Sequence, residues 1–169
     1  SGFYHERVPD IYRHYQQRLG GAPAVDFDDI LKLTVELFQA FPDVLERWQN
    51  RFRYVLVDEY QDTNHAQYML VKMLSARHGN ICVVGDSDQS IYAFRGADMR
   101  NILEFEKDYA DARIILLEQN YRSTQNILDA ANAVITNNVG RKPKRLWTDK
   151  GTGDTLVLFE AQDEHEEAA

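Results

Sequence analysis

One short pattern occurs three times in this chain and restricts its fold more than any other feature. It is an unbroken run of apolar residues followed directly by polar ones. The runs cover residues 54–57, 81–84 and 114–117, and they are followed by Asp58-Glu59, Gly85-Asp86 and Glu118-Gln119. Apolar runs without alternation are typical of strands buried on both faces of a parallel sheet. Because helical patterns separate the runs, we expect an α/β fold with parallel strands and right-handed crossovers.

Apolar residues at helical spacing predict the helices around these strands. The expected helices start near Pro9, Asp26, Asn64, Asp98 and Ser123, the last ends close to Gly140, and a further strand is expected at 155–159. Pro42 is expected to end the second helix, and a short amphipathic turn follows it. Thr63 or Asn64 is expected to cap the helix at 64–78, so the preceding acids are not needed as caps.

Composition limits the class of protein. With 169 residues, the chain is long enough for one ordinary domain, or for one domain and part of another. The net charge of −8 argues against a protein that coats nucleic acid along its whole surface. Cys82 is the single cysteine, which suits a reducing cytosol. No apolar run approaches the roughly 20 residues of a membrane span, so we expect neither a membrane span nor a signal peptide before the first helix.

The first candidate site is the acid pair at the end of the run at 54–57. Ligands of open α/β sheets bind beyond the carboxyl ends of the strands, where Asp58 and Glu59 lie. Neighbouring residues of a strand point to opposite faces, so one acid can hold a metal while the other orients a water. This is the Walker B pattern of nucleotide hydrolases. Taken alone, acids at the end of a buried strand could equally cap the next helix, a role for which Thr63 or Asn64 is better suited here.

The second candidate site is the segment 85–98, after the second apolar run. A glycine there allows a tight turn, and Gln89 then supplies an amide where a strand-end ligand would lie. Tyr92, Phe94 and Arg95 form a cluster that can stack bases and hold a phosphate. The alternative is that the two aromatic rings pack into the core.

The third candidate site is the segment 117–124. Tyr121 and Arg122 lie between an expected strand and the N-terminus of an expected helix, a position that favours anions such as phosphate. The alternative for Arg122 is an ordinary ion pair on the surface.

Together these blocks resemble one known family. Residues 57–64 (VDEYQDTN), 84–98 (VGDSDQSIYAFRGAD) and 117–124 (LEQNYRST) are similar to motifs of the UvrD/PcrA/Rep-type superfamily 1 DNA helicases, and residues 26–31 resemble the stretch upstream of them. The blocks occur in the family's order and spacing, over residues 26 to 137.

The resemblance implies a RecA-like parallel sheet with flanking helices and an ATP-dependent activity. The family translocates 3′ to 5′ along single-stranded DNA and unwinds duplex junctions, so a role in DNA repair or replication in the bacterial cytoplasm is implied. ATP and Mg²⁺ would be the cofactors.

The same resemblance assigns a role to individual residues. Asp58 would coordinate Mg²⁺, Glu59 would activate water, Gln89 would sense the γ-phosphate, Tyr121 would stack on adenine, Arg122 would be the arginine finger, and Tyr92, Phe94 and Arg95 would contact DNA. Two positions depart from the family. Phe94 stands where tryptophan is common, and Ala93 stands where a larger basic residue is common.

A larger departure concerns the phosphate-binding loop. No Gly-x-x-x-x-Gly-Lys-Ser/Thr occurs in the sequence. We therefore interpret the chain as an internal piece of a helicase, inactive by itself and completed by the rest of the helicase chain. It would comprise the end of an inserted helical subdomain (1–24), the C-terminal half of a first RecA-like ATPase domain (25–117) and the start of a second (118–169). The alternatives are a non-catalytic DNA- or protein-binding domain of helicase descent, or a helicase subunit of a nuclease complex.

Overall fold

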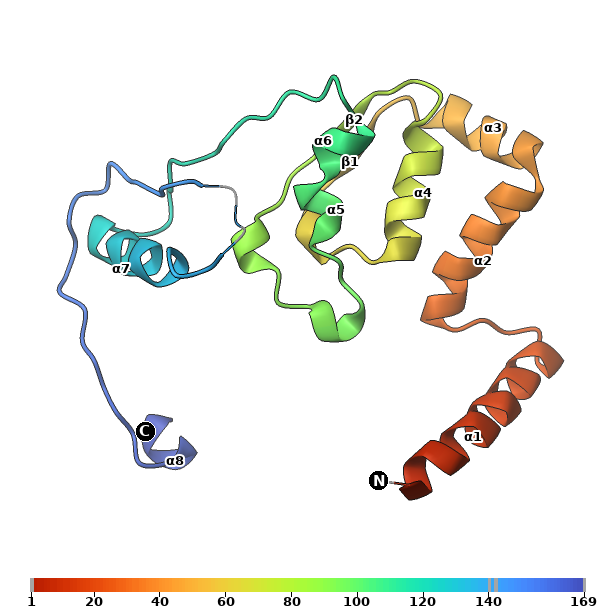
Figure 1. Cartoon of the computed structure of the whole chain (residues 1–169), viewed down its shortest axis with the longest axis horizontal. Coiled ribbons are helices and arrows are strands. Elements are labelled where there is room, and N and C mark those ends of the chain that lie inside the picture. The colour runs from red at the N-terminus through yellow and green to blue at the C-terminus, as the bar shows by residue number, and fades with distance from the viewer. Residues whose placement is uncertain (1, 140, 142, 169) are drawn as a thin grey trace. The chain divides into compact units, whose positions relative to one another are not determined.

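The computed structural model describes residues 2–139, 141 and 143–168 (Figure 1). The chain forms two compact units that divide between Glu104 and Phe105. Within the described residues, no helix combines the length and the apolar character that crossing a membrane requires.

The first unit begins with three helices, α1 (Gly2–Gly21), α2 (Phe27–Ala40) and α3 (Pro42–Arg51). The prediction that the first helix starts at Pro9 is wrong, because Pro9 lies inside α1. A proline suits the first helical turn, but the donor it lacks does not prevent the residues before it from being helical. Pro42 follows the end of α2 as expected. Because proline is favoured at the first helical position, the expected short turn is a complete helix, α3.

Capping boxes fix the starts of α2 and of α4 (His65–Ser75). Asn64 Oδ1 accepts from the backbone N–H of Gln67 at 2.9 Å, and the Gln67 side chain accepts from the backbone N–H of Asn64 at 2.9 Å. Asp26 and Asp29 make the same reciprocal pair at the start of α2. Each box satisfies two backbone donors that a helix start would leave free. Of the two caps considered for α4, Asn64 is the one used.

The first unit contains a small parallel sheet. β1 (Val55–Val57) pairs with β2 (Ile81–Val83), with Val55 opposite Ile81 and Val57 opposite Val83. α4 connects the two strands, contacts β1, and packs with α2 and α3 into a helical layer (Figure 1). The predicted mixed α/β class with parallel strands and flanking helices is confirmed.

The apolar sequences of β1 and β2 predict strands that are buried on both faces. In the structure, one face of these strands is exposed. Leu56, in the middle of β1, is 77% exposed, and Cys82 opposite it is also exposed. Val55 and Val57 alternate with Leu56 and are partly buried. The face that carries Leu56 and Cys82 is therefore left uncovered by the described residues.

Two predicted strands are absent from the described residues. Residues 114–117 and 155–159 form no ladder, and their large apolar side chains are exposed. A strand exists only when a neighbouring strand accepts and donates its backbone hydrogen bonds, and the described residues supply no such neighbour for either run. Both predictions are wrong for this structure.

The expected helix at 98–109 is two short helices, α5 (Arg100–Leu103) and α6 (Phe105–Asp108), and the division between the two units falls between them. The second unit also contains α7 (Gln125–Ile135) and α8 (Glu164–Glu167). Leu128 on α7 is its most buried apolar residue, as Tyr60 and Phe38 are in the first unit. The helix is expected to end near Asn138 and Gly140, but α7 ends at Ile135, and Gly140 itself lies outside the described residues.

Candidate functional site

Asp58 and Glu59 lie where β1 ends, and the backbone turns sharply at the second acid. Glu59 adopts the left-handed conformation, with φ 49° and ψ 41°, and leads into the short 3₁₀-helix η1 (Tyr60–Asp62). Asp58 Oδ1 accepts a hydrogen bond of 2.8 Å from the backbone N–H of Glu59. Both acids are exposed. A non-glycine residue in this conformation is uncommon and persists only where the surrounding structure holds it.

Gln61 is the residue that fixes this turn. Its side chain is inside the protein, with 1% of the residue exposed. Nε2 donates to Glu59 Oε2 at 2.9 Å and to Asp62 Oδ2 at 3.2 Å, while Oε1 accepts from the backbone N–H of Asp86 at 3.0 Å. The side chain therefore connects the end of β1 to the segment that follows β2.

Gly85 permits this connection. A Cβ atom at Gly85 would stand 2.6 Å from Gln61 Oε1 and 2.8 Å from Ile102 Cδ1, closer than real Cβ contacts allow. The end of β2 and the side chain of Gln61 can approach each other only because residue 85 has no side chain.

Gln89 belongs to the same hydrogen-bonded network. It ends the short 3₁₀-helix η2 (Ser87–Gln89), and its Nε2 donates to Asp86 Oδ2 at 2.9 Å. The other oxygen of Asp86 accepts from the backbone N–H of Asp88 at 2.9 Å. Glu59 and Gln89, predicted from separate sequence blocks, are thus joined through Gln61 and Asp86.

The segment 92–95 after η2, which contains the short 3₁₀-helix η3 (Ala93–Arg95) and is called the aromatic loop below, is exposed. Phe94 is 78% exposed, and Tyr92 is about half as exposed as Phe94. Their ring centroids are 6.0 Å apart at 41°, and Arg95 Cζ lies 5.2 Å from the Tyr92 centroid and 5.4 Å from that of Phe94. Phe94 does not pack into the core, so the packing alternative is wrong for this residue. The loop presents two π-faces and one guanidinium.

The loop is fastened at its far end to the start of α4. Asn64 and Ala97 form an antiparallel bridge, and the backbone N–H of Asp98 donates to the carbonyl oxygen of Thr63 at 3.0 Å. Asn101 Nδ2 donates to the same carbonyl at 3.0 Å and to Thr63 Oγ1 at 3.1 Å. These bonds join the aromatic loop to the segment that follows Glu59.

Asp98, at the end of the second sequence block, is hydrogen-bonded to Arg100 through both its side chain and its backbone. The Arg100 side chain donates to both of its carboxylate oxygens, with Nη2 to Oδ2 at 2.6 Å, and the Arg100 backbone N–H adds a bond of 3.0 Å. These hydrogen bonds favour the charged form, so they hold the pKa of Asp98 below its usual value.

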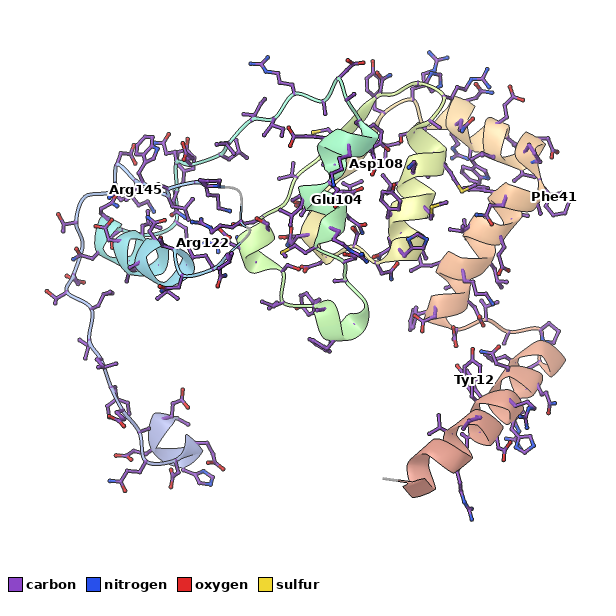
Figure 2. The ribbon with its side chains drawn as sticks, viewed as in Figure 1. Tyr12, Phe41, Glu104, Asp108, Arg122 and Arg145 are labelled. Atoms are coloured by element: carbon purple, nitrogen blue, oxygen red, sulfur yellow. The ribbon has the colours of Figure 1, made fainter. Side chains whose placement is uncertain are left out.

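Tyr121 and Arg122 belong to the second unit, in the loop before α7, where Figure 2 labels Arg122. Tyr121 is 71% exposed and donates from its hydroxyl to Gln119 Oε1 at 2.9 Å. Asn120 Oδ1 accepts from the backbone N–H groups of Arg122 and Ser123, at 2.9 and 2.7 Å. The loop is thus shaped by Asn120, and the Arg122 side chain is exposed.

The N-terminus of α7 differs from the sequence expectation. The first two amides of α7, those of Gln125 and Asn126, donate to the carbonyl oxygens of Gly151 and Thr152 at 2.9 and 3.0 Å. Donors already bonded to carbonyls are not available to an anion, so the expected phosphate-binding helix terminus is wrong for these two amides.

A magnesium site can be judged from the oxygen donors alone. Among the described residues, no group of three or more acids, histidines or cysteines is placed so that it could hold a metal ion. Mg²⁺ bound with a nucleotide does not need such a cluster, because phosphate oxygens and waters complete its coordination around one or two carboxylates. Asp58, exposed at the end of β1, fits that requirement.

The structure brings together one part of the predicted site. Glu59 and Gln89 share a network, Asp58 is hydrogen-bonded within it, and Tyr92, Phe94 and Arg95 follow on the next loop. Sequence reasoning missed Gln61 and Asp86. Gln61 stands two positions after Glu59, and Asp86 is the first acid after β2. Those positions were the available signal, but burial of Gln61 was not visible in the sequence.

Two family models match the chain. The UvrD/REP helicase N-terminal domain matches residues 2–110, and the UvrD-like helicase C-terminal domain matches residues 115–169.

Several similar proteins are bacterial helicases. The chain is 58% identical over 165 residues to the "ATP-dependent DNA helicase PcrA" of Leuconostoc citreum, covering 98% of the chain and 22% of that protein. It is 60% identical over 168 residues to the "ATP-dependent DNA helicase UvrD1" of Mycobacterium bovis, covering 95% and 22%. The Staphylococcus aureus "ATP-dependent DNA helicase PcrA" is 55% identical over 168 residues, with 99% and 23% covered.

The chain thus spans between a fifth and a quarter of the length of these relatives. The resemblance drawn from the three sequence blocks is confirmed by the N-terminal model, which matches more than half of the residues. The chain belongs to the UvrD/REP helicase family.

Proposed function

We propose that this chain is part of an ATP-dependent DNA helicase that moves 3′ to 5′ along single-stranded DNA and opens duplex junctions. The observation that carries the proposal is the network Glu59–Gln61–Asp86–Gln89 at the carboxyl ends of two parallel strands. Ligands of such sheets bind at this edge. The relatives' names, "ATP-dependent DNA helicase", support the same reading.

Within this function, the first unit contributes most of the hydrolytic residues. Asp58 would hold Mg²⁺, which neutralises phosphate charge when it is bound. Glu59 would orient the attacking water and accept its proton, because its carboxylate is fixed by Gln61 at 2.9 Å. Gln89 would donate its amide to the γ-phosphate in place of Asp86, to which it is now bonded.

The exposed aromatic loop would contact DNA. Every base has a π-face, so stacking on Phe94 and Tyr92 needs no particular sequence. Arg95, near both rings, would add a phosphate contact. The net charge of −8 is compatible with this proposal because the contact is confined to one loop.

The second unit would supply Tyr121 as the adenine platform and Arg122 as the arginine finger. The ring of Tyr121 is exposed, and the Arg122 side chain is exposed as well. The proposed domains are the end of an inserted helical subdomain (1–24), the C-terminal half of the first RecA-like domain (25–117) and the start of the second (118–169). A location in the bacterial cytoplasm is part of the same proposal, supported by the bacterial relatives.

A non-catalytic DNA-binding domain is the main alternative. A domain that only binds has no chemical need for Glu59, Gln61, Asp86 and Gln89 to be joined in one network. We therefore prefer the motor.

The complete protein that contains this chain tests the proposal. We expect ATP-dependent unwinding of a duplex with a 3′ single-stranded tail and little unwinding of the same duplex with a 5′ tail. The 169-residue chain alone is expected to have no DNA-stimulated ATP turnover, because it has no P-loop amides or lysine for the β- and γ-phosphates. DNA binding by the complete protein without any ATP turnover would reject the motor and support the binding domain.

A further inference from the structure

Gln61 is a buried polar side chain among exposed acids. Tyr60 and Gln61 are each 1% exposed, whereas Asp58, Glu59 and Gln89 are exposed. A buried amide is costly unless its donors and acceptor are bonded, so its partners decide why it is there.

The orientation of the Gln61 amide is fixed by its partners. The backbone N–H of Asp86 can only donate, so the atom that faces it at 3.0 Å must be Oε1. The carboxylates of Glu59 and Asp62 can only accept when ionised, so Nε2 must face them. Reversing the amide would lose all three bonds.

We propose that Gln61 is a positioning residue that sets the Glu59 carboxylate for water activation and ties it to the segment carrying Gln89. This inference rests on the proposed ATP hydrolysis. An exposed glutamate has several free torsions, and a bond from a fixed donor holds one carboxylate oxygen in place. Gln61 itself is held by the backbone N–H of Asp86, and the side-chain carboxylate of Asp86 accepts a hydrogen bond from Gln89.

The second part of the proposal is that the two halves of the site move together. Asp86 offers its backbone N–H to Gln61 and its side chain to Gln89. Ser90 Oγ adds a bond of 3.3 Å to the Gln61 carbonyl oxygen. If Gln89 moves onto a phosphate, the segment 86–90 moves with it. That displacement would pull on Gln61 and change the position of the Glu59 carboxylate.

Three substitutions of Gln61 separate the possible roles. Gln61→Met has similar volume but no hydrogen bonds. Gln61→Asn keeps an amide but is one methylene shorter. Gln61→Glu keeps an acceptor for Asp86 N–H and replaces the donor to Glu59 with an oxygen. If Gln61 orients Glu59, all three should lose kcat, and the loss should disappear in a Glu59→Gln background. If Gln61 only anchors the segment after β2, the loss should persist in that background.

Gln49→Met is a matched control. Gln49 is partly buried in the same unit, and its Nε2 donates to the carbonyl oxygen of Met73 at 2.7 Å. The substitution removes the same chemical group from a place outside the network. It is expected to leave turnover unchanged whatever it does to thermal stability.

The experiment measures DNA-stimulated kcat, KM for ATP and thermal unfolding in the complete helicase. Loss of a partner that orients a catalytic group typically costs about 10–100-fold, and we expect that loss in kcat with KM changed less than threefold. In a Glu59→Gln background, Gln61→Met should cause no further loss, because the group that it positions is already disabled.

The outcomes distinguish the positioning role of Gln61 from the helicase function on which it rests. Normal kcat in Gln61→Met, or an equal loss in the Glu59→Gln background, overturns the positioning role while leaving the helicase proposal intact. No ATP turnover by the wild-type complete protein overturns the helicase proposal itself. If Gln61→Met does not fold, the smaller Gln61→Asn, which keeps an uncharged amide, gives the same comparison.

Discussion

Gln89 donates its side-chain N–H to Asp86 Oδ2 at 2.9 Å, so the amide proposed to sense the γ-phosphate is held by a carboxylate of its own loop. The same Asp86 offers its backbone N–H to Gln61. To reach a phosphate, the Gln89 amide must exchange one anionic acceptor for another. That exchange makes its contribution depend on the bound nucleotide.

The first prediction concerns Gln89→Ala in the complete helicase. Removing one donor from charge that develops in a transition state typically costs ~10²–10³-fold in turnover. We expect a kcat loss of that order and a much smaller change in ATP affinity, measured by steady-state turnover and fluorescent-nucleotide binding. Gln49→Ala serves as a control. An equal loss of ATP affinity and turnover would make Gln89 a ground-state contact.

The second prediction concerns the two acids after β1. Glu59→Gln keeps the size and removes the proton acceptor, so turnover should fall ~10²–10⁴-fold while Mg²⁺-ATP binding persists. Asp58→Asn should instead raise the Mg²⁺ concentration needed for half-maximal activity. Glu46→Gln, which affects a surface pair with Arg77, is the control. Near-normal turnover of Glu59→Gln at saturating ATP would refute the role of Glu59.

The third prediction concerns the aromatic loop. Base stacking on one aromatic ring is worth ~1–3 kcal/mol, so Phe94→Ala should weaken single-stranded DNA binding by that amount. Because Phe94 is exposed, the thermal unfolding temperature of the Phe94→Ala protein should change little. Arg95→Ala should reduce the salt dependence of binding. Phe27→Ala, which removes a ring on α2 that is also exposed, is the control. Unchanged affinity in titrations with labelled oligonucleotides would remove Phe94 from the DNA contact.

The fourth prediction concerns Arg122. An arginine finger contributes ~10³–10⁵-fold to turnover through charge that exists mainly in the transition state. Arg122→Ala should therefore lose turnover far more than ATP affinity, and Arg122→Lys should also be poor because it lacks the planar fork. Arg13→Lys on α1, which disturbs an exposed ion pair with Asp10, is the control. A loss below tenfold with intact unwinding would reduce Arg122 to a surface arginine.

The fifth prediction concerns pH. Arg100 lowers the pKa of Asp98, so the pair stabilises the fold above the pKa of an unfolded aspartate, and that contribution is lost as pH falls through the lower folded value. Arg100 is exposed and Asp98 is partly exposed, so the effect on stability should be small and should shrink further in high salt. In an NMR titration, Arg100→Met should raise the pKa of Asp98, though not fully, because the backbone N–H of residue 100 remains. No change would contradict the assigned cause.

The sequence alone was sufficient for the features that local residue types encode. It predicted the parallel pairing of the runs that became β1 and β2, the helix between them and a polar cap at its start. It also identified the family through three blocks of side chains. The capped helix depends on neighbours only a few residues away, the parallel pairing follows from the alternation of strand and helix patterns, and the family is identified by residue types that comparison reads directly.

Other features were decided by contacts between distant residues. The apolar runs at 114–117 and 155–159 are as strand-like in composition as β1, but strand formation requires a partner, and none is present among the described residues. The first amides of α7 are occupied by the carbonyls of Gly151 and Thr152, more than twenty positions further along the chain.

The same reason explains the missed part of the site. Gln61 is a polar residue between acids, and its sequence neighbourhood predicts exposure. Its burial results from the close approach of Gly85, and its three bonds include one to Asp86, which only the pairing of β1 with β2 brings near. The sequence determined which side chains stand at the strand ends, and the tertiary structure decided which of them touch, because hydrogen bonds at this edge join segments that are adjacent only after the strands pair.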